Sequence, residues 1–193
     1  MGYDLAPQDR GRKMASKKAA GLAQMATTAQ MNTATRDDRV VNPLSLEARL
    51  VAREGIMQYA DVTITSAQVL LLATTPIELV AAPGASKILK FMGAVLKLDY
   101  GGTNAFTETA DNLTIKYVNA AGAAASQAIE CTGFIDATAD TYTTAEPVID
   151  AIVAATAIEN KALVLDNIND NFGGNAGDDN SLIVRCFYQI VTI

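Results

Sequence analysis

The C-terminal stretch of the chain alternates between two kinds of side chain with a period of two residues. Leu182, Val184, Cys186, Tyr188 and Ile190 form a wholly apolar set, and the residues between them are mixed in polarity. A β-strand sends successive side chains to opposite faces, so the pattern predicts a long strand here. One of its faces should pack in a core, and the other should be partly covered.

Alternation of this kind recurs from residue 61 onward. Leu113, Ile115 and Tyr117 alternate with polar residues, which predicts a half-buried strand. Other strands are predicted at residues 77–80, 87–98, 128–135 and 161–166. In the long strand at residues 87–98, a bulge at Gly93 would turn both Lys90 and Lys97 toward solvent.

Turn signals separate these strands, and no helix-length pattern lies between them. The signals are Pro83-Gly84, Gly101-Gly102, Gly122 and the polar stretch at residues 169–180. Ser66 opens a short helical turn that reaches Leu72, and its hydroxyl could cap that turn. We therefore predict a mainly β fold, an antiparallel β-sandwich that is jelly-roll-like, and not a parallel α/β fold.

The chain contains no histidine, and this narrows the chemistry open to it. Histidine is the commonest general acid or base and a frequent metal ligand, so its absence removes Ser-His-Asp triads, Cys-His pairs and nearly all catalytic zinc sites. Trp is also absent and aromatic residues make up 6% of the chain, which disfavours a sugar-binding cleft. We expect no catalytic residue, no cofactor and no metal, although catalysis by carboxylates or lysine is not excluded.

The two cysteines and the N-terminus indicate where the protein is made. Cys131 and Cys186 lack CxxC spacing, so we interpret them as small buried apolar side chains in a reducing compartment, with a disulfide left open. Residues 1–22 lack the apolar segment of a signal peptide, and the run at residues 69–73 is too short to cross a bilayer. We expect synthesis in a cytoplasm and no membrane partner.

Charge divides the chain into an arm at residues 1–58 and a body at residues 59–193. Residues 1–54 carry nine basic and six acidic residues, a net charge of +3. Residues 55–193 carry six basic and fifteen acidic residues, a net charge of −9. The favoured interpretation is an arm that docks on an acidic partner, ahead of a disordered solvated tail. Nucleic-acid binding ranks third, because the arm has few aromatic residues on which bases could stack.

The arm is rich in good helix formers, and two helical segments are predicted in it. Met14, Leu22, Met25 and Ala29 would share one side of a first helix, which we expect to be stabilised by a partner. Asn42 and Pro43 favour the start of a second helix that ends at Gly55. The candidate partner-binding residues of the arm are Arg10, Arg12, Lys13, Lys17, Lys18, Leu22, Met25, Arg36, Arg39, Leu46 and Leu50.

One loop partly matches a calcium-binding pattern. Asn167, Asn169 and Asn171 alternate like calcium ligands, and Asp178 lies near the position of a final ligand. The spacing departs from the pattern because Gly173 comes one residue late and Asp178 replaces the bidentate Glu. We interpret the segment as a polar surface loop whose Asn, Asp and Gly residues permit tight turns.

From Ile64 to the C-terminus the chain resembles a β-sandwich family of structural proteins from tailed bacteriophages. The residues that carry the resemblance are ITSAQVLLLATTPIELVAAPG (64–84), VLKLDYGGT (95–103), NLTIKY (112–117) and LIVRCFYQIV (182–191). The resemblance implies a non-enzymatic virion protein of the capsid decoration, or cement, type. It also implies a homotrimer that binds the major capsid protein at the capsid surface.

Two other functions stay open from the sequence. A tail, fibre or baseplate adaptor could use the same sandwich, although the chain shows no repeats and no long coiled coil. A carbohydrate-binding or enzymatic sandwich is the third hypothesis. The basic arm favours a docking protein over both.

Overall fold

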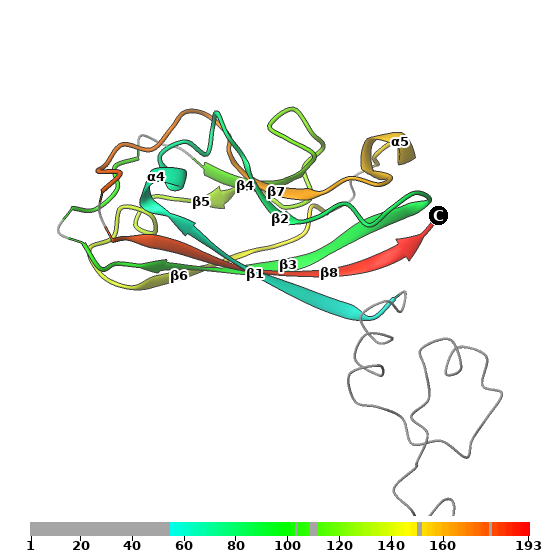
Figure 1. Cartoon of the computed structure of the whole chain (residues 1–193), viewed down its shortest axis with the longest axis horizontal. Helices are drawn as coiled ribbons and strands as arrows, with labels where there is room; N and C mark the ends of the chain where they lie inside the picture. The colour runs from blue at the N-terminus through cyan, green and yellow to red at the C-terminus, as the bar shows by residue number, and fades with distance from the viewer. Residues whose placement is uncertain (1–54, 103, 109–111, 150–151, 178) are drawn as a thin grey trace, which may run out of the picture. The chain divides into compact units, whose positions relative to one another are not determined.

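The computed structural model describes residues 55–102, 104–108, 112–149, 152–177 and 179–193. Two antiparallel sheets of four strands each form stacked layers (Figure 1). The first sheet has the order β1-β8-β3-β6, with β1 at Met57–Thr65, β8 at Ser181–Thr192, β3 at Lys87–Asp99 and β6 at Thr141–Ala145. The second has the order β2-β7-β4-β5, with β2 at Ile77–Val80, β7 at Leu163–Asn167, β4 at Asn112–Tyr117 and β5 at Ile129–Glu130. The predicted mainly β sandwich is confirmed; the arm's predicted helices lie outside the described residues.

The core lies between the two sheets and is built by the alternation seen in the sequence. Leu182, Val184 and Cys186 of β8 are completely buried, as are Leu113 and Ile115 of β4. Removal of these apolar side chains from water is the main force that holds the layers together. The long strand predicted at the C-terminus is therefore confirmed, and its apolar set faces the core.

Both cysteines belong to this core. The side chains of Cys131 and Cys186 have no exposed surface, as the sequence predicted. Burial raises the pKa of Cys186 to about 12, because the thiolate would lose its hydration in the apolar interior. The thiol therefore stays protonated and unreactive at neutral pH.

The predicted bulge in β3 is present. The pairing of β3 with β8 shifts register between Phe91 and Gly93, and Gly93 has a φ of +140° that side chains rarely adopt. The extra residue changes the alternation, so Phe91 and Ala94 both face the core. Lys90 and Lys97 consequently lie on the outer side of the first sheet, as the bulge hypothesis required.

The strand predicted at residues 128–135 is wrong over most of its length. Only β5, Ile129–Glu130, pairs as a strand. The chain then turns, and the N–H groups of Phe134 and Ile135 both donate to the carbonyl oxygen of Cys131. The apolar run remains buried because this turn, and not a strand, carries Phe134 and Ile135 into the core.

The short helical turn is confirmed, but its predicted cap is wrong. α4 spans Ser66–Val69, and Thr65 is the N-cap residue. The Gln68 side-chain oxygen accepts hydrogen bonds from the Thr65 N–H at 2.9 Å and the Thr65 hydroxyl at 3.1 Å. The buried Ser66 hydroxyl instead donates to the carbonyl oxygen of Asn180 at 2.9 Å, which ties α4 to the segment before β8.

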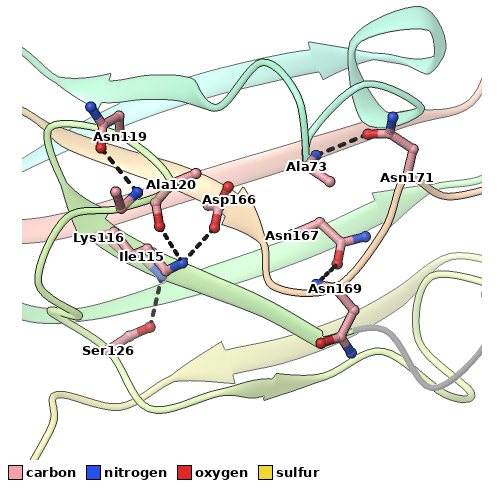
Figure 2. A network of polar contacts seen from close by, with 11 residues as sticks. Ala73, Ile115, Lys116, Asn119, Ala120, Ser126, Asp166, Asn167, Asn169 and Asn171 are labelled. Atoms are coloured by element: carbon pink, nitrogen blue, oxygen red, sulfur yellow. Dashed lines mark hydrogen bonds and ion pairs between the residues drawn. The ribbon is translucent and has the colours of Figure 1, made fainter.

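The outer face of the second sheet is covered at its central strands β4 and β7, so β4 is less exposed than the half-buried strand that its sequence predicted. Thr114 and Asp166 lie opposite each other on β4 and β7 and are 3% and 1% exposed. The Lys116 ammonium is 2.7 Å from an Asp166 carboxylate oxygen and donates to the carbonyl oxygen of Ala120 at 2.8 Å (Figure 2). The chain after β4 folds back on this strand, and the Ile115 N–H donates to the Ser126 hydroxyl. The polar side chains of β4 thus face protein groups and not water.

Candidate protein-contact face

The outer face of the first sheet differs from that of the second because it exposes large apolar side chains. Register places Tyr59 of β1 opposite Phe187 of β8, and Lys97 of β3 opposite Tyr142 of β6. The exposed large apolar side chains of these strands are Met57 (60%), Tyr59 (62%), Met92 (36%), Val95 (38%) and Tyr142 (68%). Together with the part-buried Ile183 and Phe187 of β8, these side chains are called the outer face below.

Arg185 organises the centre of the outer face. Its Nε and Nη2 atoms each donate to one carboxylate oxygen of Asp61 at 2.7 Å, which is the bidentate geometry that suits a guanidinium. The guanidinium carbon also lies 4.9 Å from the centre of the Tyr59 ring. Hydrogen bonding from Arg185 lowers the pKa of Asp61, so the pair is fully charged at neutral pH.

A second ion pair network lies at the β6 side of the same face. The Lys97 ammonium is 2.5 Å from Asp99 and 2.8 Å from Asp140. Hydrogen bonds from Lys97, and then from the Tyr100 N–H, lower the pKa of Asp140, whereas the two carboxylates raise the pKa of Lys97. Arg185 and Lys97 therefore both have carboxylate partners within this chain.

This arrangement suits contact with another protein. Exposed apolar side chains that cluster over several strands mark interaction sites more often than scattered ones do. Tyr, Met, Phe and Arg are the residue types that protein interfaces favour, and Arg185 is already held in place by Asp61. The face offers area and shape for a partner but no reactive group.

A cavity of about 320 Å³ lies beside β3 and β4, and among the residues that line it only Lys90 and Tyr117 have a side chain that could exchange a proton. The Tyr117 hydroxyl already donates to the carbonyl oxygen of Leu89 at 2.7 Å. No three His, Cys, Asp or Glu side chains of the described residues gather where a metal could bind.

The calcium-like loop residues serve local structure in this fold. Asn167 is buried at the end of β7, and its side-chain oxygen accepts from the Asn169 N–H at 3.3 Å. The Asn171 side-chain oxygen accepts from the Ala73 N–H at 3.0 Å, so Asn167 and Asn171 serve separate segments (Figure 2). Asp178 lies outside the described residues. Asn167 therefore supports a local turn, as interpreted from the sequence, whereas Asn171 joins the loop to the distant segment at Ala73.

All eleven partner-binding residues predicted in the arm lie outside the described residues, so their role stays a prediction. The structure instead exposes large apolar residues that the sequence analysis did not select, above all Met57, Tyr59 and Tyr142. A signal for two of them was present, because Met57, Tyr59 and Asp61 alternate with the set Ala60, Val62 and Ile64. Asp61 is charged and the second set is wholly apolar, so the alternation indicates that Met57 and Tyr59 lie on the solvent side, a signal that the sequence analysis did not use.

No helix within the described residues is long and apolar enough to cross a membrane.

Comparisons with known proteins give loose structural likenesses, and two of them are described here. No protein-family model matches the chain, and no curated protein matches its sequence. A solved structure of the capsid asymmetric unit of cyanophage Pam1 is 14% identical, with a TM-score of 0.38, over 69% of this chain and 83% of that one. A semi-empty virus-like particle of the Macrobrachium rosenbergii nodavirus is 7% identical, with a TM-score of 0.24, over 73% of this chain and 97% of that one. Both similar proteins come from viral capsids, and at these TM-scores neither likeness carries an argument about this chain.

Proposed function

We propose that this chain is a structural virion protein that decorates and stabilises a bacteriophage capsid. In this proposal the body associates with other copies, as a homotrimer, and the arm binds subunits of the major capsid protein. The observation that carries the proposal is the outer face of the first sheet, which exposes Met57, Tyr59 and Tyr142 on a sandwich whose described residues form no cluster of metal ligands. The resemblance of residues 64–191 to tailed-phage structural proteins supports the virion setting.

The charge distribution supports a role for the arm in docking. Residues 1–54 carry a net charge of +3 and the rest of the chain −9. An arm that lies across neighbouring shell subunits adds contacts that the body need not supply, and each added contact raises the apparent affinity through effective concentration. Binding to the assembled shell then stabilises the particle by mass action.

The test is cosedimentation of the purified full chain with phage capsids that lack it, scored for stoichiometry. Saturable binding in multiples of three copies per capsomer is the result expected for trimeric decoration. Failure to sediment with shells, with recovery in tail fractions instead, would replace this proposal with the tail, fibre or baseplate adaptor.

A further inference from the structure

We propose that the outer face of the first sheet is the surface through which the body binds a second copy of this chain. The inference deepens the proposed function by assigning its self-association to named residues, and it rests on that part of the proposal. Three features of the described residues support it: the near neutrality of the face, the long regular edge strand beside it and the contrast with the second sheet.

The outer face is close to electrically neutral on a strongly acidic body. With the residues that flank β6 included, its positive residues are Lys90, Lys97 and Arg185 and its negative residues are Asp61, Asp99, Asp140 and Glu146. Residues 55–193 carry a net charge of −9, so most of that excess lies elsewhere on the body. Two copies that approach by other surfaces repel each other within a Debye length of about 8 to 10 Å, whereas contact through this face brings nearly neutral surfaces together.

The same near neutrality disfavours a charged partner on this face. A basic partner would gain more from the acidic remainder of the body, and an acidic partner would be repelled by it. Arg185 and Lys97 are already held by carboxylates of this chain, so they offer no free cation to an acidic peptide. A second copy, which presents the same uncharged apolar side chains, fits the face better than either.

The edge strand that borders the face also lacks the features that prevent pairing with other chains. β1 ends the strand order of the first sheet, and it pairs with β8 over nine residues without a register shift. The strand contains neither Lys nor Pro, and its one charged residue, Asp61, is bound by Arg185. Monomeric proteins usually protect such an edge with charges, Pro, bulges or a short strand.

The second sheet shows what a protected arrangement looks like in the same molecule. Its edge strands are β2, which has four residues and a register shift between Glu78 and Val80, and β5, which has two residues. Its outer face is buried at Thr114, Val164 and Asp166. Only the first sheet combines an exposed apolar face with a long regular edge in the part of the chain that is described.

The experiment measures the mass of the free full-length protein by sedimentation equilibrium over a range of concentrations. The wild-type chain is expected to form an oligomer, and Tyr59→Glu and Met57→Glu are each expected to weaken its association at least about tenfold. Tyr59 and Met57 are more than half exposed, so a charge at either position should leave the body folded. Circular dichroism and thermal unfolding of each variant check this.

Ile152→Glu is the matched control, because Ile152 is fully exposed and is not on a strand of the first sheet. Its association should equal that of the wild type, and Tyr59→Phe should also retain it. The inference is overturned if the wild type is monomeric, if the Tyr59 and Ile152 variants weaken association equally, or if only deletion of residues 1–54 abolishes it.

Cosedimentation of the same variants with shells is scored separately. Shell binding by a monomeric wild type would end this inference and the proposed trimer but leave decoration standing, and an oligomer that ignores shells would end the decoration proposal alone.

Discussion

At the scale of single residues, the Lys116–Asp166 pair shows how the body holds charge in its interior. Asp166 is 1% exposed, and the Lys116 ammonium lies 2.7 Å from one of its oxygens. A buried carboxylate is costly unless a cation and hydrogen bonds compensate for its lost hydration. The pair therefore fixes the outer face of the second sheet against the loop at Ala120, to which Lys116 also donates.

Replacement of Lys116 by Met should destabilise the body by roughly 3 to 5 kcal/mol, because it leaves the Asp166 carboxylate buried without a cation. Urea unfolding of the wild type and the variant measures the difference in the free energy of unfolding. The double variant Lys116→Met with Asp166→Asn should recover a large part of the loss, since the uncompensated charge is gone. A Lys116→Met variant as stable as the wild type would show that the pair contributes nothing.

At the scale of elements, the bulge in β3 determines which lysines reach solvent. The register shift leaves Met92 as the extra residue between Phe91 and Gly93, so the strand keeps its apolar residues inward on both sides of the shift. The Gly93 φ of +140° is open to glycine and strained for residues that carry a Cβ atom. The Cβ of an alanine there would also lie 3.4 Å from the carbonyl oxygen of Ala145 on β6.

Gly93→Ala should therefore lower the free energy of unfolding by about 1 to 3 kcal/mol, the usual cost of a residue held in a sparsely populated conformation. Chemical denaturation gives the value. Gly177→Ala is the control, because a Cβ at residue 177 meets its nearest atom at an ordinary distance of 3.5 Å and no positive φ is required. Equal losses in both variants would contradict the bulge as the cause.

The elements that were predicted correctly are those whose pattern has one interpretation. β8 shows strict alternation, and Gly93 with two out-of-phase lysines allows few solutions other than a bulge. The run at residues 128–135 failed because apolar side chains can be buried from a turn as well as from a strand. Met57 and Tyr59 were missed because large apolar side chains are expected in a core, although Asp61 and Thr63 on the same side of β1 indicate solvent.

At the scale of the whole molecule, charge and apolar surface are separated. The body carries a net charge of −9, but its outer face combines near-neutral charge with exposed apolar side chains. The N-terminal 54 residues carry +3. In the proposed function the outer face and the arm bind different partners. The outer face binds other copies of the chain, and the arm binds an acidic surface on the shell.

Deletion of residues 1–54 tests this division. The body should fold alone, because the buried apolar residues of the described chain all lie between Ile64 and Cys186. The cut also preserves the contacts at the start of the body, where the Gly55 N–H donates to Ile190 and the Gly55 carbonyl oxygen accepts from the Gln189 side chain, each at 3.0 Å. Thermal unfolding should be unchanged to within a few degrees, roughly the shift that corresponds to less than 1 kcal/mol.

The same truncated protein should lose shell binding, by at least about tenfold in affinity, while it still forms the oligomer. A full-length variant with Lys13, Lys17 and Lys18 all replaced by Glu separates charge from length, because it keeps the arm but reverses three of its basic residues. Electrostatic docking predicts that this variant binds shells as weakly as the truncated protein and that the wild type weakens as salt rises. Shell binding by the truncated protein equal to that of the full chain would show that the body alone docks, and the arm would then have no part in decoration.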